Sequence, residues 1–333
     1  MSPENESFFN EKNHRIRTIA KNLRAQLDAD NYRGDPLPTA ASIRSALKHM
    51  LKVKNTLALY QGFYRRAGKP SLLRLAAKNR LEWADVYPYL YLRAAFEGLK
   101  PNREVRHLVI DEMQDYPPVQ LAVINRIYAC SKTLLGDFAQ AVNPCQRHTL
   151  QDLQKLYPGA ETIELHRSYR STCEIIQFAL RFQPQAGIEP VTRHGQAPVV
   201  TCAQDEHAQW DAILSVMDTF LTGSHATFGL ILKTDADAKR MWESLPAAYK
   251  AYWIAPGSST FPTGICVLSI HLAKGLEFDE VLISDVSAKQ YSCDFDRQLL
   301  YVACTRAMHR LTLTCAGAPS PFLRGWRPPS FVP

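Results

Sequence analysis

Two adjacent carboxylates, Asp111 and Glu112, directly follow a short apolar run at residues 108–110. In nucleotide-hydrolysing folds the first carboxylate of such a pair holds Mg²⁺, usually through water, and the second orients the attacking water. The pair alone is equally compatible with a strand that ends in a solvated acidic turn. Gln114 and Asp115 extend it to Asp-Glu-Met-Gln-Asp, a far rarer string, and so favour the chemical interpretation.

The elements around the carboxylates predict a parallel sheet. The continuous apolar run at 108–110 is typical of a strand buried on both faces. Ligands of open α/β sheets bind outside the carboxyl ends of such strands, where the two carboxylates would lie. A second buried strand is predicted at 133–135, and it ends in Gly136-Asp137-Phe138-Ala139-Gln140.

The remaining chain alternates strands with helices. Helical spacing of apolar residues and capping signals predict helices at 3–29, 39–55, 81–97, 117–129, 205–221, 235–245 and 295–308. Further strands are predicted at 198–202, 227–232, 265–270, 280–284 and 309–315. The aromatic residues of 81–97 favour core packing over a stacking platform for bases. Alternation of this kind predicts an α/β fold with a parallel, doubly wound sheet.

The composition is that of a soluble globular protein. A chain of 333 residues with 46% hydrophobic and 21% charged residues can bury a large core and is expected to form two domains. No apolar stretch approaches the roughly 20 residues that span a bilayer, and the polar, acidic N-terminus shows no signal peptide. The eight cysteines form no Cys-x-x-Cys pair, so neither a zinc site nor a disulfide framework is indicated. A cytoplasmic protein without a membrane partner is expected.

The positive charge is concentrated in one third of the chain. Residues 1–100 hold 18 Lys and Arg against 9 Asp and Glu, whereas residues 101–333 hold 21 against 23. This excess indicates either a polyanion or an acidic protein as a partner of residues 1–100. A solvated helix surface explains the same charges equally well.

The sequence contains no P-loop. That motif needs Gly, four residues and then Gly-Lys-Ser/Thr between a strand and a helix. The single Gly-Lys pair, Gly68-Lys69, has Phe63 at the place of the first glycine and Pro70 at the place of the hydroxyl residue. The cradle for β- and γ-phosphates is therefore missing from these residues.

Five strings stand in one order along the chain: Asp111-Glu112-Met113-Gln114-Asp115, Gly136-Asp137-x-x-Gln140, Ser168-Tyr169-Arg170-Ser171, Ser269-Ile270-His271-x-x-Lys274-Gly275-Leu276-Glu277-Phe278 and Tyr301-Val302-Ala303-x-Thr305-Arg306-Ala307. This series resembles motifs II to VI of the UvrD/Rep helicases of superfamily 1, and the resemblance covers about 105–315. Within that superfamily the chain looks most like the HelD branch, which in bacteria engages RNA polymerase. The strings at 87–92, 299–309 and 319–323 carry this finer likeness.

The resemblance implies a role in ATP hydrolysis for five residues. Asp111 would hold Mg²⁺ through water, and Glu112 would activate the attacking water. Gln140 and Arg170 would reach the γ-phosphate, and Arg306 would act as an arginine finger that neutralises charge as the phosphoryl group leaves.

The resemblance also implies contacts with the rest of the nucleotide and with nucleic acid. Tyr169 would stack on adenine and Glu277 would accept hydrogen bonds from the ribose, with Lys274 and Gly275 near phosphate. His271 would touch nucleic acid. Taken singly, each of these residues could be a surface charge or a satisfied core polar group, and this alternative stays open for His271 and Lys274.

Three departures from the family limit the expectation. The P-loop segment and the glutamine motif before it are missing. Residues 141–144, Ala-Val-Asn-Pro, replace aromatic residues that stack on single-stranded bases in the family. Only 100 residues separate Arg170 from His271, too few for the large inserted subdomain of UvrD-type unwinding enzymes.

The expected architecture is two RecA-like lobes behind a basic helical segment. Residues 1–100 would form that segment, 101–167 an incomplete first lobe, 168–318 the second lobe and 319–333 a tail. The expected function is the C-terminal part of an ATP-dependent DNA helicase or translocase that remodels transcription complexes together with the missing N-terminal half of the enzyme. Its partners would be DNA or RNA polymerase, and the chain alone would be inactive. The alternatives are a module that docks on RNA polymerase or DNA without hydrolysis, and a complete protein whose P-loop comes from a partner chain.

Overall fold

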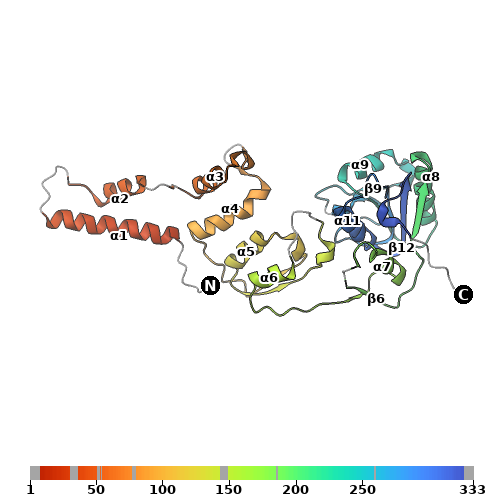
Figure 1. The fold of residues 1–333 in the computed structure, drawn as a ribbon, viewed down its shortest axis with the longest axis horizontal. Coiled ribbons are helices and arrows are strands. Elements are labelled where there is room, and N and C mark those ends of the chain that lie inside the picture. The colour runs from red at the N-terminus through yellow and green to blue at the C-terminus, as the bar shows by residue number, and fades with distance from the viewer. Residues whose placement is uncertain are drawn as a thin grey trace. The chain divides into compact units, whose positions relative to one another are not determined.

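The computed structural model of the protein describes residues 8–30, 37–50, 53, 55–76, 80–142, 149–184, 187–258 and 260–325 (Figure 1). The chain forms two compact units. The first comprises Met1–Gly136 and His148–Ala160, and the second comprises Asp137–Arg147 and Glu161–Pro333. The carboxylates at 111 and 112 therefore belong to the first unit, and Gln140 belongs to the second.

The first unit begins with four helices: α1 Phe8–Ala29, α2 Ala40–His49, α3 Thr56–Arg66 and α4 Trp83–Phe96. Thr39 caps α2 as expected, by accepting a hydrogen bond from the backbone N–H of Ser42 over 3.1 Å. The prediction that this helix continues to residue 55 is wrong. Asn55 instead accepts a hydrogen bond from the Ala58 backbone N–H over 2.8 Å and so starts α3. The predicted start of the first helix at residues 3–7 lies outside the described residues.

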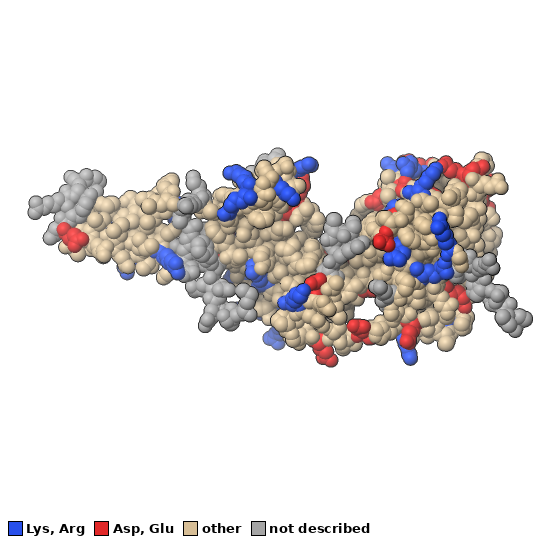
Figure 2. All heavy atoms as spheres, viewed as in Figure 1, with Lys and Arg blue, Asp and Glu red and all other residues tan. Residues whose placement is uncertain are grey.

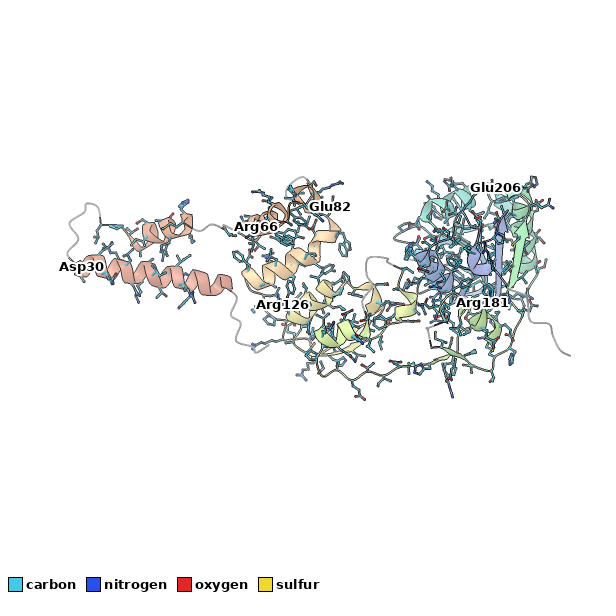
Figure 3. All side chains as sticks on the ribbon, in the orientation of Figure 1. Asp30, Arg66, Glu82, Arg126, Arg181 and Glu206 are labelled. Carbon is cyan, nitrogen blue, oxygen red and sulfur yellow. The ribbon has the colours of Figure 1, made fainter. Side chains whose placement is uncertain are left out.

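Helix α4 packs on both α3 and α5 (Pro118–Ile127). On the α3 side, the hydroxyls of Tyr60 and Tyr64 donate to the buried carboxylate of Asp85 over 2.7 and 2.9 Å. On the α5 side, the Arg126 guanidinium lies 4.0 Å from the centre of the Tyr91 ring; Figure 3 labels Arg126 on α5. Of the aromatic side chains of α4, only Phe96 is buried, whereas Trp83 and Tyr91 are 75% and 38% exposed. The predicted core packing is therefore confirmed for Phe96 and not for Trp83.

The sheet of the first unit has two strands in the part that the structure describes. Strand β3 (His107–Ile110) pairs in parallel with β4 (Ser131–Leu134), and α5 connects them. The prediction of a strand buried on both faces is wrong, because Ile110 is 5% exposed whereas Val109 is 59% exposed. Successive side chains of a strand point to opposite faces, and here only one face is covered. Helix α6 (Leu150–Leu156), which packs on α5, and the two-residue strands β1 (Leu75–Ala76) and β2 (Arg80–Leu81) were not predicted.

The second unit is built on a six-stranded parallel sheet with the order β7-β12-β11-β8-β10-β9. Its strands are β7 Val199–Ala203, β8 Thr227–Leu232, β9 Tyr252–Trp253, β10 Gly264–Ser269, β11 Phe278–Ile283 and β12 Ala307–Ala316. Its helices are α7 Cys173–Ala179, α8 Glu206–Leu221, α9 Asp235–Ser244, α10 Ile270–Ala273 and α11 Asp294–Cys304. A separate pair, β5 Arg167–Ser168 and β6 Glu189–Pro190, precedes the sheet. The predicted parallel, doubly wound α/β fold is confirmed here.

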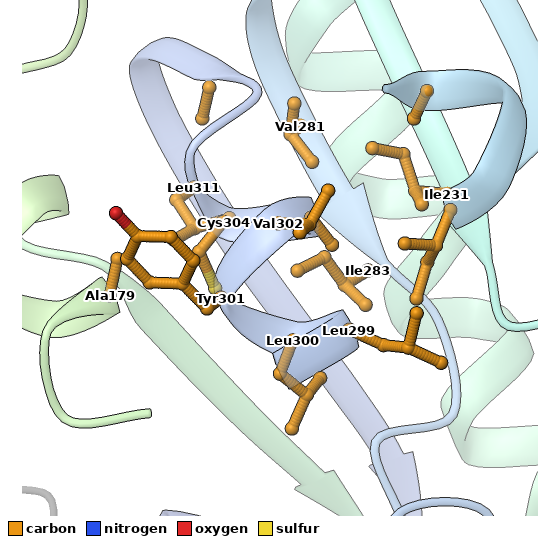
Figure 4. Close-up of a cluster of buried hydrophobic side chains, with 14 of the residues drawn as sticks. Ala179, Ile231, Val281, Ile283, Leu299, Leu300, Tyr301, Val302, Cys304 and Leu311 are labelled. Atoms are coloured by element: carbon orange, nitrogen blue, oxygen red, sulfur yellow. The ribbon is translucent and has the colours of Figure 1, made fainter. Parts of the chain in front are cut away.

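Two hydrophobic cores lie on opposite faces of this sheet. Helices α7 and α11 cover one core, which is drawn in Figure 4, and α8 and α9 cover the other. The predicted helix over 295–308 ends earlier, at Cys304, because the Thr305 hydroxyl donates to the Val302 carbonyl over 2.9 Å and closes a turn before β12. The short helices α7 and α10 were not predicted. Of the predicted tail, residues 326–333 lie outside the described residues.

Candidate functional site

The acidic pair of the first unit lies at the carboxyl end of β3, as expected. Glu112 adopts the left-handed conformation, with φ of +51°, which a non-glycine residue rarely takes and which costs on the order of 1 kcal/mol. Its backbone N–H donates to the Asp111 carboxylate over 2.8 Å. Its own carboxylate accepts a hydrogen bond from the Gln114 amide over 2.6 Å. Strained backbone that neighbouring groups hold in place is typical of functional sites.

The chain leaves no room for a side chain at Gly136, two residues after the end of β4. A Cβ atom there would lie 2.3 Å from the Gln114 amide oxygen and 2.7 Å from Cγ of Met113. The Met113 backbone N–H also donates to the Leu135 carbonyl over 2.9 Å. The end of β4 therefore presses on the turn that carries the carboxylates. Gln114 and Gly136 both lie in the motif strings, but no local signal in the sequence indicates this contact.

The second unit contains a cavity of about 530 Å³ that collects four of the predicted site residues. Gln140, Tyr169, Arg170, Glu277, Arg167, Ser168, Ser171, Ile176, Ile188, Tyr301 and Thr305 line it. Its volume lies within the range of about 300–1,000 Å³ that small-molecule sites occupy. Residues from three further motif strings thus line the same cavity as Gln140. The most distant of them in the sequence, Thr305, lies 165 positions after Gln140.

A short loop after β5 carries the exposed side of the cavity. The Tyr169 side chain is 70% exposed, and Arg170 forms an ion pair of 2.5 Å with Glu277. Two contacts fix this loop to the rest of the unit. The Ser171 hydroxyl donates to the Ala307 carbonyl over 2.6 Å, and Arg193 donates to the Arg170 carbonyl over 2.9 Å.

Arg306 lies behind the cavity and is only 1% exposed. Its guanidinium donates to the Gln140 side-chain oxygen over 2.5 Å and to the Val302 carbonyl over 3.1 Å. The Gln140 amide in turn donates to the Asp137 carboxylate over 2.9 Å. The structure therefore brings Gln140 and Arg306 into direct contact, in an arrangement where the arginine is enclosed by protein atoms. Its role as an arginine finger stays a prediction.

The three other predicted residues lie outside the cavity lining. His271 is exposed on α10, Lys274 follows that helix, and Gly275 has φ of +80°, where glycine is strongly favoured. The tight turn at Gly275 places Glu277 at the start of β11, and only Glu277 of this string reaches the cavity. The roles predicted for the other three residues remain untested.

At the end of β3, the described residues offer a magnesium ion two neighbouring carboxylates, Asp111 and Glu112. Among the described residues, no cluster of three or more His, Cys, Asp or Glu side chains could hold a metal ion. This donor set fits Mg²⁺ in nucleotide enzymes, where one or two carboxylates are supplemented by water and substrate phosphates. Asp111, which is exposed, is compatible with that mode.

Comparison with known proteins identifies the second unit more closely. Residues 264–314, from β10 into β12, match the family of the UvrD-like helicase C-terminal domain. The chain is a homologue of UvrD-type helicases. It is 24% identical over 262 residues to the ATP-dependent DNA helicase PcrA of Leuconostoc citreum, which covers 72% of this chain and 35% of PcrA.

Two further relatives extend the comparison. YjcD of Bacillus subtilis (strain 168) is 26% identical over 168 residues, which cover 46% of this chain and 22% of YjcD. The C-terminal domain of a possible DNA helicase from Lactobacillus plantarum WCFS1 is 32% identical and covers 47% of this chain and 92% of that structure, with a TM-score of 0.40. The chain thus spans no more than 35% of the length of the curated relatives PcrA and YjcD.

Tyr301, Arg193 and Arg167 contribute to the site although the sequence predicted no role for them. Tyr301 opens the last motif string, but no role was assigned to it. Arg193 lies in no motif, and its second contact, with the His309 ring at 3.0 Å, joins residues 116 positions apart. No local signal in the sequence indicates such a contact, whereas Tyr301 could have been considered from its place in the string.

Proposed function

We propose that the second unit supplies the nucleotide-contacting half of an ATP-dependent DNA helicase or translocase. The observation that carries this proposal is the cavity that gathers Gln140, Tyr169, Arg170 and Glu277 in one place. Cationic, carboxylate, amide and aromatic groups converge there, which matches the mixed polarity of a nucleotide. PcrA, a homologue, is named as an ATP-dependent DNA helicase.

Each part of ATP has a matching group in the cavity. Tyr169 is exposed enough to stack on adenine, and Glu277 can accept hydrogen bonds from ribose hydroxyls. Arg170 can pair with a phosphate, and this would exchange its ion pair with Glu277 for a bond to the ligand. Gln140, whose side-chain oxygen accepts a hydrogen bond from Arg306, would form the wall next to the phosphates in this assignment.

Hydrolysis needs two further contributions. Asp111 and Glu112 of the first unit are the proposed Mg²⁺-binding and water-activating residues. A Gly-x-x-x-x-Gly-Lys-Ser/Thr segment does not occur in these 333 residues, so the phosphate cradle must come from elsewhere. We therefore expect ATP to bind weakly to this chain and not to turn over.

The finer proposal is that this motor remodels transcription complexes in the manner of HelD, with RNA polymerase or DNA as the partner. The strings at 87–92, 299–309 and 319–323 support it. A second candidate is a module that docks on RNA polymerase or DNA without hydrolysing ATP. The basic excess of residues 1–100 favours this candidate, and Figure 2 shows Lys and Arg side chains gathered over the end of α3.

Titration with millimolar ATP, followed by heteronuclear NMR, separates the two candidates. The nucleotide-site proposal expects saturable binding, with Arg170→Ala and Glu277→Ala each weakening it by about tenfold, the value of one charge-assisted hydrogen bond. Arg240→Ala is the matched control, because it removes a surface ion pair on α9 of the same unit. Wild-type chain that binds no ATP, or binding that both cavity variants retain, would contradict the proposal and favour the docking module.

A further inference from the structure

Five buried side-chain atoms lack a hydrogen-bond partner in the described part of the chain. They belong to Tyr157, Thr172, Trp253, Tyr291 and Tyr301. Of these five residues, Tyr301 is the one that also lines the cavity with Tyr169 and Arg170. A buried polar group without a partner is unfavourable by about 1–3 kcal/mol, so its presence beside a cavity calls for an explanation.

Packing holds the Tyr301 ring in one place. The residue is 1% exposed and lies on α11 within the core between that helix and α7. Figure 4 shows the ring reaching away from the helix beside Ala179, with the hydroxyl at its far end. A phenylalanine would fill the same space, so the packing gives no reason for the hydroxyl.

The surroundings keep the hydroxyl protonated. Burial raises the pKa of Tyr301, and the Asp137 carboxylate raises it further, whereas Arg306 opposes the shift. The group is therefore a hydrogen-bond donor at any physiological pH. Asp137 and Arg306 are the two residues that hold Gln140, so the hydroxyl lies on the side of the cavity that the proposed function gives to phosphate.

We propose that Tyr301 is a ligand-binding residue whose hydroxyl donates a hydrogen bond to a phosphate oxygen of the bound nucleotide. This inference rests on the proposed function, because it uses the same cavity and ligand. Arg167 and Arg170 line the same cavity, and these two cationic residues favour an anionic ligand over a neutral one, for which Arg170 would exchange its ion pair with Glu277. A phosphate oxygen provides the acceptor that the protein does not, and the ligand thereby satisfies a group that is unpaired in the protein alone.

The alternative is a water molecule that satisfies the hydroxyl permanently. Buried water commonly serves such groups. In that case Tyr301 has a structural role, and removal of the hydroxyl would leave nucleotide binding unchanged.

The test is Tyr301→Phe, with Tyr291→Phe as the matched control. Tyr291 is also fully buried, also has an unpartnered hydroxyl and belongs to the same core, but it does not line this cavity. We expect both variants to raise Tm by about 2–4 °C, because each loses an unsatisfied buried group. Only Tyr301→Phe should weaken binding, by about tenfold for ATP and for inorganic tripolyphosphate and not at all for adenosine.

Each outcome decides one point. Wild-type chain that binds neither ATP nor tripolyphosphate overturns the proposed function and this inference together. Wild-type binding that Tyr301→Phe retains in full overturns this inference alone and favours the water molecule. Equal losses for adenosine and ATP overturn the assignment to phosphate, and equal losses in Tyr291→Phe show that the effect is not local to the cavity.

Discussion

The two units of the molecule hold their predicted site residues by different means. In the second unit, a six-stranded sheet with a core on each face supports the cavity, and the contacts that position Arg170 and Gln140 come from the same unit. In the first unit, two four-residue strands support Asp111 and Glu112, and Val109 and Leu135 remain 59% and 48% exposed. Deep burial makes the second arrangement rigid, whereas the first depends on a few local hydrogen bonds.

Truncation of one apolar strand residue in each unit should give the largest contrast. Leu282 of β11 is fully buried, so Leu282→Ala is expected to reduce the free energy of unfolding of the second unit by about 2–5 kcal/mol. Val109→Ala should change the stability of the first unit by no more than about 0.5 kcal/mol. Urea denaturation with a probe in each unit measures both. Similar losses for the two variants would refute the contrast.

Acid should weaken the second unit through Asp296, which caps α11. Burial alone would raise the pKa of Asp296, but the Lys233 ammonium at 2.6 Å and the backbone N–H groups of Ser292 and Cys293 lower it below its ordinary value of about 3.9. The resulting stability is complete above about pH 4 and is lost as pH falls through the lowered pKa.

Asp296→Asn should therefore cost about 1.5–3 kcal/mol at neutral pH and flatten the acid limb of stability against pH. Asp294→Asn is the control, because its carboxylate is exposed in the same helical turn. Unfolding followed by circular dichroism between pH 2 and 7 measures both curves. An unchanged acid limb in Asp296→Asn would show that another group controls it.

A substitution at Gly136 tests the close contact between the end of β4 and the turn that carries the carboxylates. Gly136→Ala forces a methyl group against Gln114 and Met113 and should cost about 1–3 kcal/mol, with faster amide exchange in β3 and β4. In Gly62→Ala, in the same unit, the added methyl group would meet only the end of the flexible Arg66 side chain, at 4.0 Å, so this variant should be neutral or stabilising by up to about 1 kcal/mol. Hydrogen exchange of both variants tests whether the close contact at Gly136 matters.

The smallest expected effect concerns the charge of the first unit. Polyanion binding, where it occurs, should map to residues 1–100, and its log affinity should fall by about 0.9 per phosphate contact for each log unit of salt. Fluorescence anisotropy with labelled DNA at several salt concentrations measures the slope. Equal binding by a chain shortened to begin at Asn102 would disprove the mapping. Salt-insensitive binding to RNA polymerase would instead favour a protein partner.

The sequence predicted the second unit well because its signals are local and consistent. Strands such as β8 and β10 are continuous apolar runs between clear turn residues, and all six strands except β9, with only two residues, were predicted. Ligands of parallel sheets bind at the carboxyl ends of the strands. Together with the motif strings, this predicted Gln140, Arg170 and Glu277 as site residues, and all three line the cavity.

The errors have physical causes that lie beyond local sequence. The apolar run at β3 looks buried on both faces, but burial depends on what covers each face, and only one face is covered. The contacts of Arg306 with Gln140 and with backbone carbonyls also have no signal in the sequence, and its predicted role toward phosphate stays untested. The unpaired hydroxyl of Tyr301 is a property of tertiary packing and cannot be read from residue order.

The central claim is that the cavity of the second unit is a nucleotide site. Hydrogen exchange measured by mass spectrometry, with and without millimolar ATP, tests it most directly. We predict that ATP slows exchange in the loop at 167–171 and at the start of β11, and leaves α8 and α9 on the opposite face of the sheet unchanged. Protection confined to α8 and α9, or none in the second unit, would contradict the claim.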